Sequence, residues 1–368
     1  MHLSLGGKGS PMKSHYTFLL ILIAFVTNST AQEINVSSPN IHQFLNNAEK
    51  NLDFNGTVLL IRGNDTLVHQ GYGYSDRKNK ISTNKSIAYN IASVTKGFTA
   101  IAIMKLVEEG KLSLSDPLKK YFENLPIDKN TITIHHLLSH TSGIGQNYAA
   151  EGEKELEKAA EKILQLPLVD SVGKRFLYSN DNYMLLGIII EKLTGGTWES
   201  YITRTILSPL EMNETFFQNE YGAVTNLRVP MIDGKKPNIN NRDYGMMSST
   251  GIFSTAIDLA KLGKALYTHK ILTQASKNLL FGKYTKIQSP WAGSNSFYGY
   301  AFFVTEIEGV PIEKIWLRGN EDQWGTAIAF WLPKTETTLI VLSNSLTLSN
   351  GEKPHIYISN QILKNFIR

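Results

Sequence analysis

Cysteine is absent from this chain of 368 residues, so no disulfide can stabilise it. The chain also lacks a block of basic residues, because 37 lysines and arginines against 32 acidic residues give a formal net charge of only +5. A nucleic-acid binder should carry a clustered basic face, so the charge pattern argues against a nucleic-acid partner. Hydrophobic residues make up 42% of the chain, enough for a sizeable core, and that core must supply the stability.

Several short motifs are missing as well. There is no G-x-S-x-G, no Walker loop and no G-x-G-x-x-G. Their absence argues against an α/β-hydrolase and against a nucleotide-dependent enzyme. The chain also shows no internal repeat and no low-complexity linker, so we expect one catalytic unit rather than independent domains.

The apolar run near the N-terminus is short. "YTFLLILIAFV", Tyr16–Val26, follows the basic Lys13 and precedes "STA" and Gln32. Eleven residues cannot cross a bilayer, which takes about 20. We therefore expect residues 1–31 to be a secretory signal and residues 32–368 to be an exported domain, periplasmic or secreted, without a stable membrane anchor. The alternative is an anchor that the mature protein keeps.

Hydrophobic periodicity predicts strands near both ends of the chain and helices between them. Residues 56–73 contain two β-type runs around "GND", a hairpin signal, and the apolar residues 94–107 before Gly110 predict a buried helix. Further helices are expected at 116–125, 133–142, 153–166, 182–196, 254–267 and 355–368, and strands at 298–309, 325–333 and 337–344. This order predicts an α+β protein, with one sheet built from both termini and a helical lobe inserted at roughly 110–250.

A serine lies three residues before a lysine in "ASVTKGF", residues 92–98. The S-x-x-K spacing occurs five times, at Ser10/Lys13, Ser75/Lys78, Ser82/Lys85, Ser93/Lys96 and Ser171/Lys174. Of these serines, only Ser93 opens a long apolar helix, where a three-residue step places both side chains on one face. A lysine beside a buried segment loses solvation, which favours the neutral amine that could take the serine proton. The alternative is an N-cap serine with a solvent-facing lysine.

"YSN", Tyr178 to Asn180, is the second candidate motif, and it is the only Y-x-N in the chain. A phenol near an ammonium can relay a proton, and an asparagine amide can donate to and accept from a substrate amide. Asn180 or Asp181 could equally cap the following helix, a reading compatible with the functional one.

These motifs resemble the serine β-lactamase-like family, which comprises class C β-lactamases, D,D-carboxypeptidases, D-aminopeptidases and related esterases. The resemblance runs from about Phe54 to the C-terminus. It rests on "YNIASVTKGFTAIAIMKLVEEGKLSLSDPLKKYF", "ITIHHLLSHTSGI", "YSNDNYMLLGIIIEKLTG", "STGIFSTAIDLAKLGKAL" and "YGYAFFV", in that order. It implies a β-lactamase/transpeptidase-like fold, an antiparallel sheet flanked by helices plus an all-helical lobe. It also implies Ser93 as nucleophile, with Lys96 and Tyr178 in proton transfer.

The chain departs from the family's third motif, which is usually K-T-G or H-x-G on a strand lining the cleft. The corresponding region, "KIWLRGNEDQWGTAIAFWLP", has neither form. Arg318-Gly319-Asn320 is the nearest match, and another register puts Gly319 in the glycine place and Leu317 in the basic one. Arginine cannot take part in proton transfer, but it can hold a carboxylate through two parallel hydrogen bonds. We expect Arg318, Gly319 and Asn320 to contact substrate, with Asn180 orienting it.

His136 and His140 are four residues apart, a spacing that could hold a metal on a helix. No H-E-x-x-H and no obvious third ligand accompany them, so we expect neither a metal nor an organic cofactor.

The sequence thus predicts an exported serine hydrolase that acts on an amide, ester or β-lactam carbonyl of a small-molecule or peptide substrate. The rival prediction is a non-catalytic protein that binds peptidoglycan or a similar ligand. The altered third motif favours the binder, whereas the retained Ser93, Lys96 and Tyr178 favour the enzyme. The oligomeric state and the choice between peptidase, esterase and β-lactamase stay open.

Overall fold

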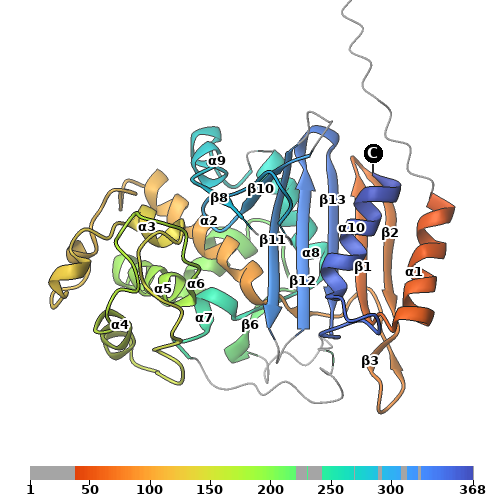
Figure 1. Ribbon diagram of the computed structural model, residues 1–368, viewed down its shortest axis with the longest axis horizontal. Coiled ribbons are helices and arrows are strands. Elements are labelled where there is room, and N and C mark those ends of the chain that lie inside the picture. The colour runs from red at the N-terminus through yellow and green to blue at the C-terminus, as the bar shows by residue number, and fades with distance from the viewer. Residues whose placement is uncertain are drawn as a thin grey trace, which may run out of the picture.

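In the computed structural model, an eight-stranded antiparallel sheet lies between two layers of helices, with further helices to one side (Figure 1). The structure describes residues 38–220, 230, 243–268, 270–288, 292–307, 313–321 and 325–367. The predicted signal segment 1–31 lies outside the described residues. No helix within the described ranges is long and apolar enough to cross a membrane.

Strands from both ends of the chain form the sheet in the order β2-β1-β13-β12-β11-β10-β9-β8. The members are β1 (Gly56–Arg62), β2 (Asp65–Tyr72), β8 (Thr285–Ile287), β9 (Ser296–Tyr298), β10 (Phe303–Glu306), β11 (Glu313–Glu321), β12 (Gly325–Leu332) and β13 (Thr337–Ser343). The predicted hairpin at 56–73 is β1 and β2, and β1 also pairs with the late strand β13. The sheet therefore joins the two termini, as the sequence predicted. Two small sheets hold β3 (Tyr74–Asp76) with β4 (Ile81–Ser82), and β5 (Tyr89–Asn90) with β7 (Ile252–Ser254) and β6 (Phe216–Phe217).

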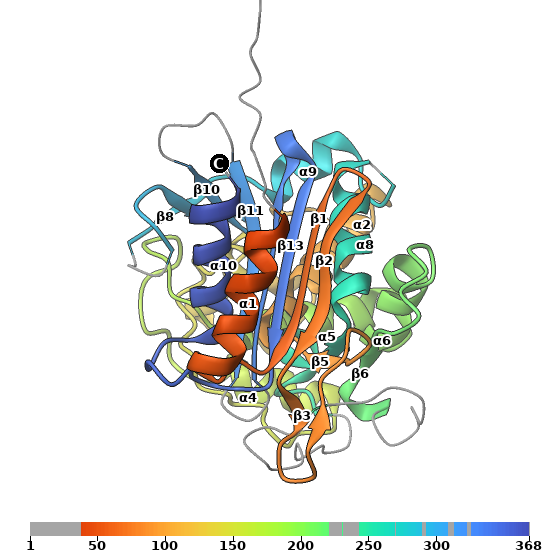
Figure 2. The ribbon, with the colours of Figure 1, turned by 90° about the vertical axis from the view of Figure 1, so that its right-hand side faces the viewer.

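Helices cover both faces of the sheet. The N-terminal helix α1 (Ser38–Leu52) and the C-terminal helix α10 (Pro354–Phe366) lie next to each other over one face, as Figure 2 shows. Helix α8 (Ala256–Tyr267) packs on the other face against β13, β12 and β1. Strand β12 is buried on both sides: Ala329 and Trp331 belong to the core below the helical lobe, and Ile328 and Phe330 to the core below α1 and α10. This alternation fits the two-residue period of a strand.

The remaining helices lie mainly between 95 and 280. They are α2 (Thr95–Glu108), α3 (Ile134–Leu138), α4 (Leu156–Leu164), α5 (Asn180–Thr194), α6 (Trp198–Ile202), α7 (Met247–Thr250) and α9 (Gln274–Leu280), with a π-helical turn, Thr203–Leu207, after α6. Short 3₁₀ turns are η1 (Ala92–Val94), η2 (Leu118–Lys120), η3 (Ile127–Lys129), η5 (Gln218–Glu220) and η6 (Pro333–Thr335). The mixed architecture confirms the predicted fold class. Helices α2 and α5 are buried almost all round, which suits their near-continuous apolar sequences.

One predicted helix is wrong. Residues 116–125 form only the 3₁₀ turn η2 and loops, because the start of the segment pairs with residues 132–134: the N–H of Leu118 donates to the carbonyl of Ile132 at 2.9 Å, and Pro117 forms a bridge with Thr133. The predicted helix at 133–142 is likewise short and ends at Leu138, where the chain turns through the left-handed backbone of His140, φ 55°.

Candidate active site

A tight turn presents Ser93 at the start of α2. The preceding residue, Ala92, has φ 45°, a left-handed conformation that is uncommon for a residue other than glycine. The side-chain oxygen of buried Asn90 accepts the N–H of Ala92 at 2.7 Å, and its amide nitrogen donates to the carbonyl of Thr250 at 3.2 Å. Ser93 itself lies in η1, two residues before α2 begins at Thr95. The turn is therefore held by specific bonds and does not simply cap the helix.

Lys96 lies directly beneath this turn and is almost fully buried, with 1% of its surface exposed. Its ammonium donates to Ser93 Oγ at 3.0 Å, to Asn180 Oδ1 at 2.7 Å and to the carbonyl oxygen of Ser249 at 3.1 Å. A lysine ammonium has three N–H groups, so these acceptors match it one for one. A solvent-facing lysine, the alternative reading of the motif, does not fit this geometry.

Tyr178 completes the surroundings of the serine hydroxyl. Its phenol oxygen lies 2.8 Å from Ser93 Oγ, and Lys96 Nζ lies 5.0 Å from the centroid of its ring. Asn180 follows two residues later as the first residue of α5, and its side-chain oxygen accepts a hydrogen bond from Lys96. The Y-x-N segment thus delivers one group to the serine and one to the lysine. This hydrogen bond with Asn180 positions Lys96, and the expected contact of Asn180 with substrate stays a prediction.

Strand β11 forms the wall of the site opposite Tyr178. Successive side chains of the strand point to opposite faces of the sheet, which sets the direction of residues 317–320. A Cβ built on Gly319 would lie 2.2 Å from the carbonyl oxygen of Ile91, so only glycine allows this close approach to the nucleophile turn. Leu317, on the same face, touches the place where a Cβ of Gly97 would be. This arrangement agrees with the alignment in which Gly319 corresponds to the glycine of the family's third motif and Leu317 to its basic residue.

Arg318 and Asn320 alternate with those residues, and both line the cleft that contains Ser93. Burial lowers the pKa of the Arg318 guanidinium, and the nearby Tyr178 acts in the opposite direction. Arg318 therefore brings a cation to the lining of the cleft, from a different strand position than the family motif suggests. Arg318, Gly319 and Asn320, which were predicted to contact substrate, all lie at the site. Arg318 and Asn320 line the cleft, whereas Gly319 packs against the nucleophile turn.

The cleft has a volume of about 260 Å³, enough for one small acyl group. It is lined by Ser93, Lys96, Phe176, Tyr178, Tyr298, Ala301, Phe303, Arg318 and Asn320. The three further aromatic rings stack edge to face, with centroids 5.0 Å apart for Phe176 and Tyr298 and 4.8 Å apart for Tyr298 and Phe303. Sequence reasoning missed this aromatic wall, although the aromatic-rich "YGYAFFV" and the Phe two residues before Tyr178 hinted at it.

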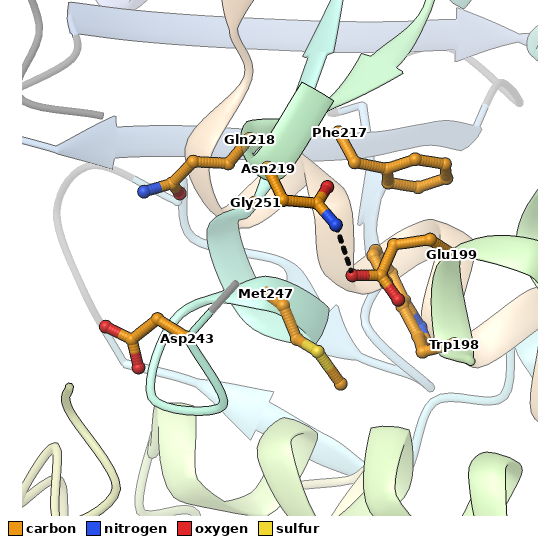
Figure 3. A pocket seen from close by; sticks show the side chains of 8 residues that line it. All are labelled: Trp198, Glu199, Phe217, Gln218, Asn219, Asp243, Met247 and Gly251. Carbon is orange, nitrogen blue, oxygen red and sulfur yellow. Dashed lines mark hydrogen bonds between the residues drawn. The ribbon is translucent and has the colours of Figure 1, made fainter. Parts of the chain in front are cut away.

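Two other cavities fit a small-molecule reaction less well. One of about 330 Å³ lies between α8, α9 and the start of β11, and its lining includes Lys277 and Glu336 but no serine. The other, shown in Figure 3, has a volume of only about 10 Å³, room for about one water. There Asn219 donates to Glu199 at 3.3 Å. Size alone would choose the 330 Å³ cavity, but the chemistry lies in the Ser93 cleft.

The histidines at positions 136 and 140 have separate surroundings. His136 Nδ1 accepts the N–H of Thr133 at 3.1 Å in a capping box of α3. His140 is fully buried against aromatic rings, and its Nδ1 accepts the N–H of Ser179 at 3.2 Å. Within the described ranges, no group of three or more His, Cys, Asp or Glu side chains could hold a metal ion.

Comparisons with known proteins show the family and the fold of this chain. A family model described as Beta-lactamase matches residues 44–360. The Putative penicillin-binding protein PbpX of Bacillus subtilis (strain 168) is 32% identical over 268 residues, which cover 72% of this chain and 65% of that protein. The chain therefore spans just under two thirds of that relative.

Solved structures show the same fold. The octameric penicillin-binding protein homologue from Pyrococcus abyssi superposes with a TM-score of 0.74 at 28% identity, over 89% of this chain and 79% of that one. The D-amino acid amidase from Ochrobactrum anthropi SV3 superposes with a TM-score of 0.72 at 21% identity, over 88% of this chain and 96% of that one.

Proposed function

The chain belongs to the Beta-lactamase family, and from that premise we propose that it is a serine hydrolase in which Ser93 carries an acyl group. The observation that carries the proposal is the convergence of Lys96 Nζ and the Tyr178 hydroxyl on Ser93 Oγ, at 3.0 and 2.8 Å. A nucleophile within hydrogen-bond reach of a base, itself oriented by further groups, is the arrangement that activates a serine. Here Asn180 and the Ser249 carbonyl orient Lys96.

In acylation, one proton passes from Ser93 to the leaving group, and a bond from the carbonyl carbon to Ser93 Oγ replaces the bond to the leaving group. In the reactive state Lys96 has released one of its three protons to solvent, so the Ser93 hydroxyl donates to the neutral amine, and the Ser93 oxygen attacks the carbonyl carbon of an amide, ester or β-lactam. As the C–O bond to Ser93 forms, the proton passes to Lys96, alone or together with Tyr178. Tyr178 then gives its proton to the leaving nitrogen or oxygen as the bond between that atom and the carbonyl carbon breaks, and the proton taken up by Lys96 restores the phenol. Water releases the acyl group by the reverse route, so the enzyme is regenerated.

The carbonyl oxygen becomes negatively charged during attack and needs N–H donors. The N–H of Ser93 is one candidate, and a second lies on the edge of β11 between Arg318 and Glu321. Strand β10 pairs with β11 only from Glu313 to Trp316, so the following residues of β11 lie beside η1 instead of β10. This close approach supports an oxyanion hole at that edge.

Arg318 gives the proposed substrate a charge preference. A guanidinium beside the cleft offers two parallel N–H donors to a planar carboxylate, whereas a neutral ester offers it little. We therefore favour substrates that carry a free carboxylate near the scissile carbonyl. Export from the cytoplasm, expected from the N-terminal sequence, would bring the site to cell-wall peptides and related compounds.

A non-catalytic ligand binder is the second candidate, and one observation favours it: Leu317 lies on the same face of β11 as Gly319, which puts a leucine in the basic place if Gly319 is the glycine of the family's third motif. A binder has no use for a buried lysine aimed at a serine hydroxyl. The contacts of Lys96 therefore make the hydrolase the better supported function.

Turnover tests the proposal. We expect the wild-type protein to hydrolyse a p-nitrophenyl ester or an aromatic D-aminoacyl amide, and Ser93→Ala to lose this activity while melting at the same temperature. Ser171→Ala is a matched control, because Ser171 and Lys174 share the S-x-x-K spacing but Ser171 is exposed. Hydrolysis that survives in Ser93→Ala would refute the assignment, and stoichiometric binding without turnover would favour the binder.

A further inference from the structure

His140 lies directly behind the catalytic tyrosine. It follows α3 in the segment "SHTSG", has no exposed surface and adopts φ 55°. Its ring lies 4.4 Å from the ring of Tyr178, centroid to centroid, and 5.2 Å from that of Tyr298. Phe176 meets it edge-on at 5.7 Å. The imidazole therefore forms the back wall of the tyrosine's pocket.

His140 also holds the backbone on both sides of Tyr178. Its carbonyl oxygen accepts the N–H of Leu177 at 2.7 Å, and its Nδ1 accepts the N–H of Ser179 at 3.2 Å. The two residues that flank the tyrosine are thus bonded to a single residue, whose ring supports the tyrosine from behind. The amide nitrogen of Asn182 lies 3.1 Å from the same Nδ1.

These bonds define the chemical state of the ring. Because Nδ1 accepts a backbone N–H, it carries no proton, and the neutral imidazole must bear its hydrogen on Nε2. Burial lowers the pKa of His140 well below its usual value, and the neighbouring Lys96 lowers it further. A neutral ring avoids placing a second cation beside Lys96.

We infer that His140 is a positioning residue for the reaction, which sets the place of the Tyr178 hydroxyl relative to Ser93 by holding Leu177, Ser179 and the tyrosine ring. The inference rests on the proposed function. Loop 175–179 leads into α5, and a loop residue needs such fixed partners to stay within reach of a nucleophile. The Tyr178–Ser93 contact of 2.8 Å would lengthen without them. Displacement of a catalytic group by about 1 Å can cost on the order of 100-fold in rate.

Two variants separate the acceptor from the ring. His140→Ala removes both, whereas His140→Asn removes the ring but places an amide oxygen near the position of Nδ1. Asparagine also tolerates the left-handed backbone well. We expect His140→Ala to slow acylation of Ser93 at saturating substrate by about 10- to 100-fold with under about 3-fold change in apparent binding. His140→Asn should stay within about 5-fold of wild type.

The decisive comparison repeats both variants in a Tyr178→Phe background. If His140 acts through the tyrosine hydroxyl, His140→Ala should cost less than about 3-fold there, because the group it positions is already gone. An equal loss in both backgrounds would show a general packing role and overturn the inference. Thermal melts of each variant identify any that has unfolded, and if His140→Ala is among them the protonation state of His140 in the wild-type protein tests the inference.

A spectroscopic measurement on the wild-type protein does not depend on turnover. In ¹⁵N-edited NMR spectra at neutral pH, we expect His140 Nδ1 in the unprotonated range and Nε2 in the protonated range. A proton on Nδ1 would remove the bond to Ser179 and overturn the inference by itself. Failure of the wild-type protein to form any acyl adduct would instead overturn the proposed function, and with it any reaction for His140 to support.

Discussion

Lys96 is the residue that separates a catalytic S-x-x-K from an ordinary helix start. We expect Lys96→Arg to lower kcat/KM by a factor on the order of 100 or more, because arginine keeps the charge but cannot become a neutral base. Lys105→Arg, on the same helix, is the matched control, since Lys105 only donates to the Ile271 carbonyl and pairs with Glu108.

Tyr178→Phe should lower kcat/KM by less than Lys96→Arg if Lys96 is the sole base, and by about as much if the two residues act as one unit. Near-normal turnover of a folded Lys96→Arg would end the proton-transfer account.

Arg318 tests the substrate preference at the same scale. Charge-assisted hydrogen bonds contribute about 1.5–3 kcal/mol, so Arg318→Ala should reduce kcat/KM for a substrate with a free carboxylate by roughly 10- to 150-fold. Its methyl ester should be nearly unaffected. Arg77→Ala serves as the control, because Arg77 pairs with the exposed Asp53 on a distant hairpin. Equal losses on acid and ester would indicate a structural role for Arg318.

Local spacing explains why Ser93, Lys96, Tyr178 and Asn180 could be found from the sequence: each pair lies within one turn or one short segment. The register of the third motif could not be fixed in that way. Whether Leu317 or Arg318 faces the cleft depends on which face of β11 meets η1, and that is decided by tertiary packing. The sequence gives no sign of the role of His140 beside Tyr178, because its contacts with Leu177 and Ser179 join segments nearly forty residues apart.

At the scale of elements, the approach of β11 to η1 defines the cleft. Gly319→Ala would place a methyl group 2.2 Å from the Ile91 carbonyl and 2.9 Å from the Ala92 side chain. We expect a loss of about 1–3 kcal/mol in the free energy of unfolding from overpacking, together with slower acylation as the strand moves away from Ser93. Chemical denaturation and acylation rates measure the two effects.

Gly196→Ala is the control for that substitution. A Cβ at Gly196 would meet only the flexible hydroxyl of Ser200, at 3.0 Å, and the residue is exposed. Gly196→Ala should leave both the free energy of unfolding and the rate of acylation nearly unchanged. A Gly319→Ala protein with wild-type stability and acylation would contradict the proposed closeness of strand and turn.

Elements with strong periodic signals were predicted well, and those limited by local backbone chemistry were not. The hairpin of β1 and β2 and the helices α2, α5, α8 and α10 follow from hydrophobic patterns that extend over several turns or strand repeats. The segment 116–125 has apolar spacing, but Pro126 disfavours the helical backbone at Leu125, and the N–H of Leu118 bonds the carbonyl of Ile132.

At the scale of the molecule, buried neutral histidines predict how stability depends on pH. His140 and His355 are both fully buried, and burial lowers the pKa of each well below the usual 6.5. The unfolded chain therefore binds more protons below about pH 6.5, so stability should fall as pH falls toward 5. Each histidine contributes up to about 1.4 kcal/mol per pH unit in that window, above the range where ordinary carboxylates titrate.

Denaturation curves between pH 5 and pH 7.5 measure this slope. His355 offers a test outside the proposed proton-transfer groups: it lies on α10, neither ring nitrogen bonds any described residue, and besides burial the charges of Arg318 and Lys353 lower its pKa. His355→Leu should reduce the slope of the free energy of unfolding against pH by the contribution of one histidine, up to about 1.4 kcal/mol per pH unit. An unchanged slope would mean that His355 is protonated or hydrated in the folded protein.

The central claim is that Ser93 becomes acylated, and mass spectrometry of the quenched reaction tests it most directly. The protein is mixed with a fluorescent penicillin and separately with an activated ester, denatured in acid within seconds, and analysed intact and after digestion. We predict one added acyl group per chain, on the peptide that contains Ser93 and not on those with Ser75, Ser82 or Ser171. An adduct on another residue, or the same adduct on Ser93→Ala, would contradict the account.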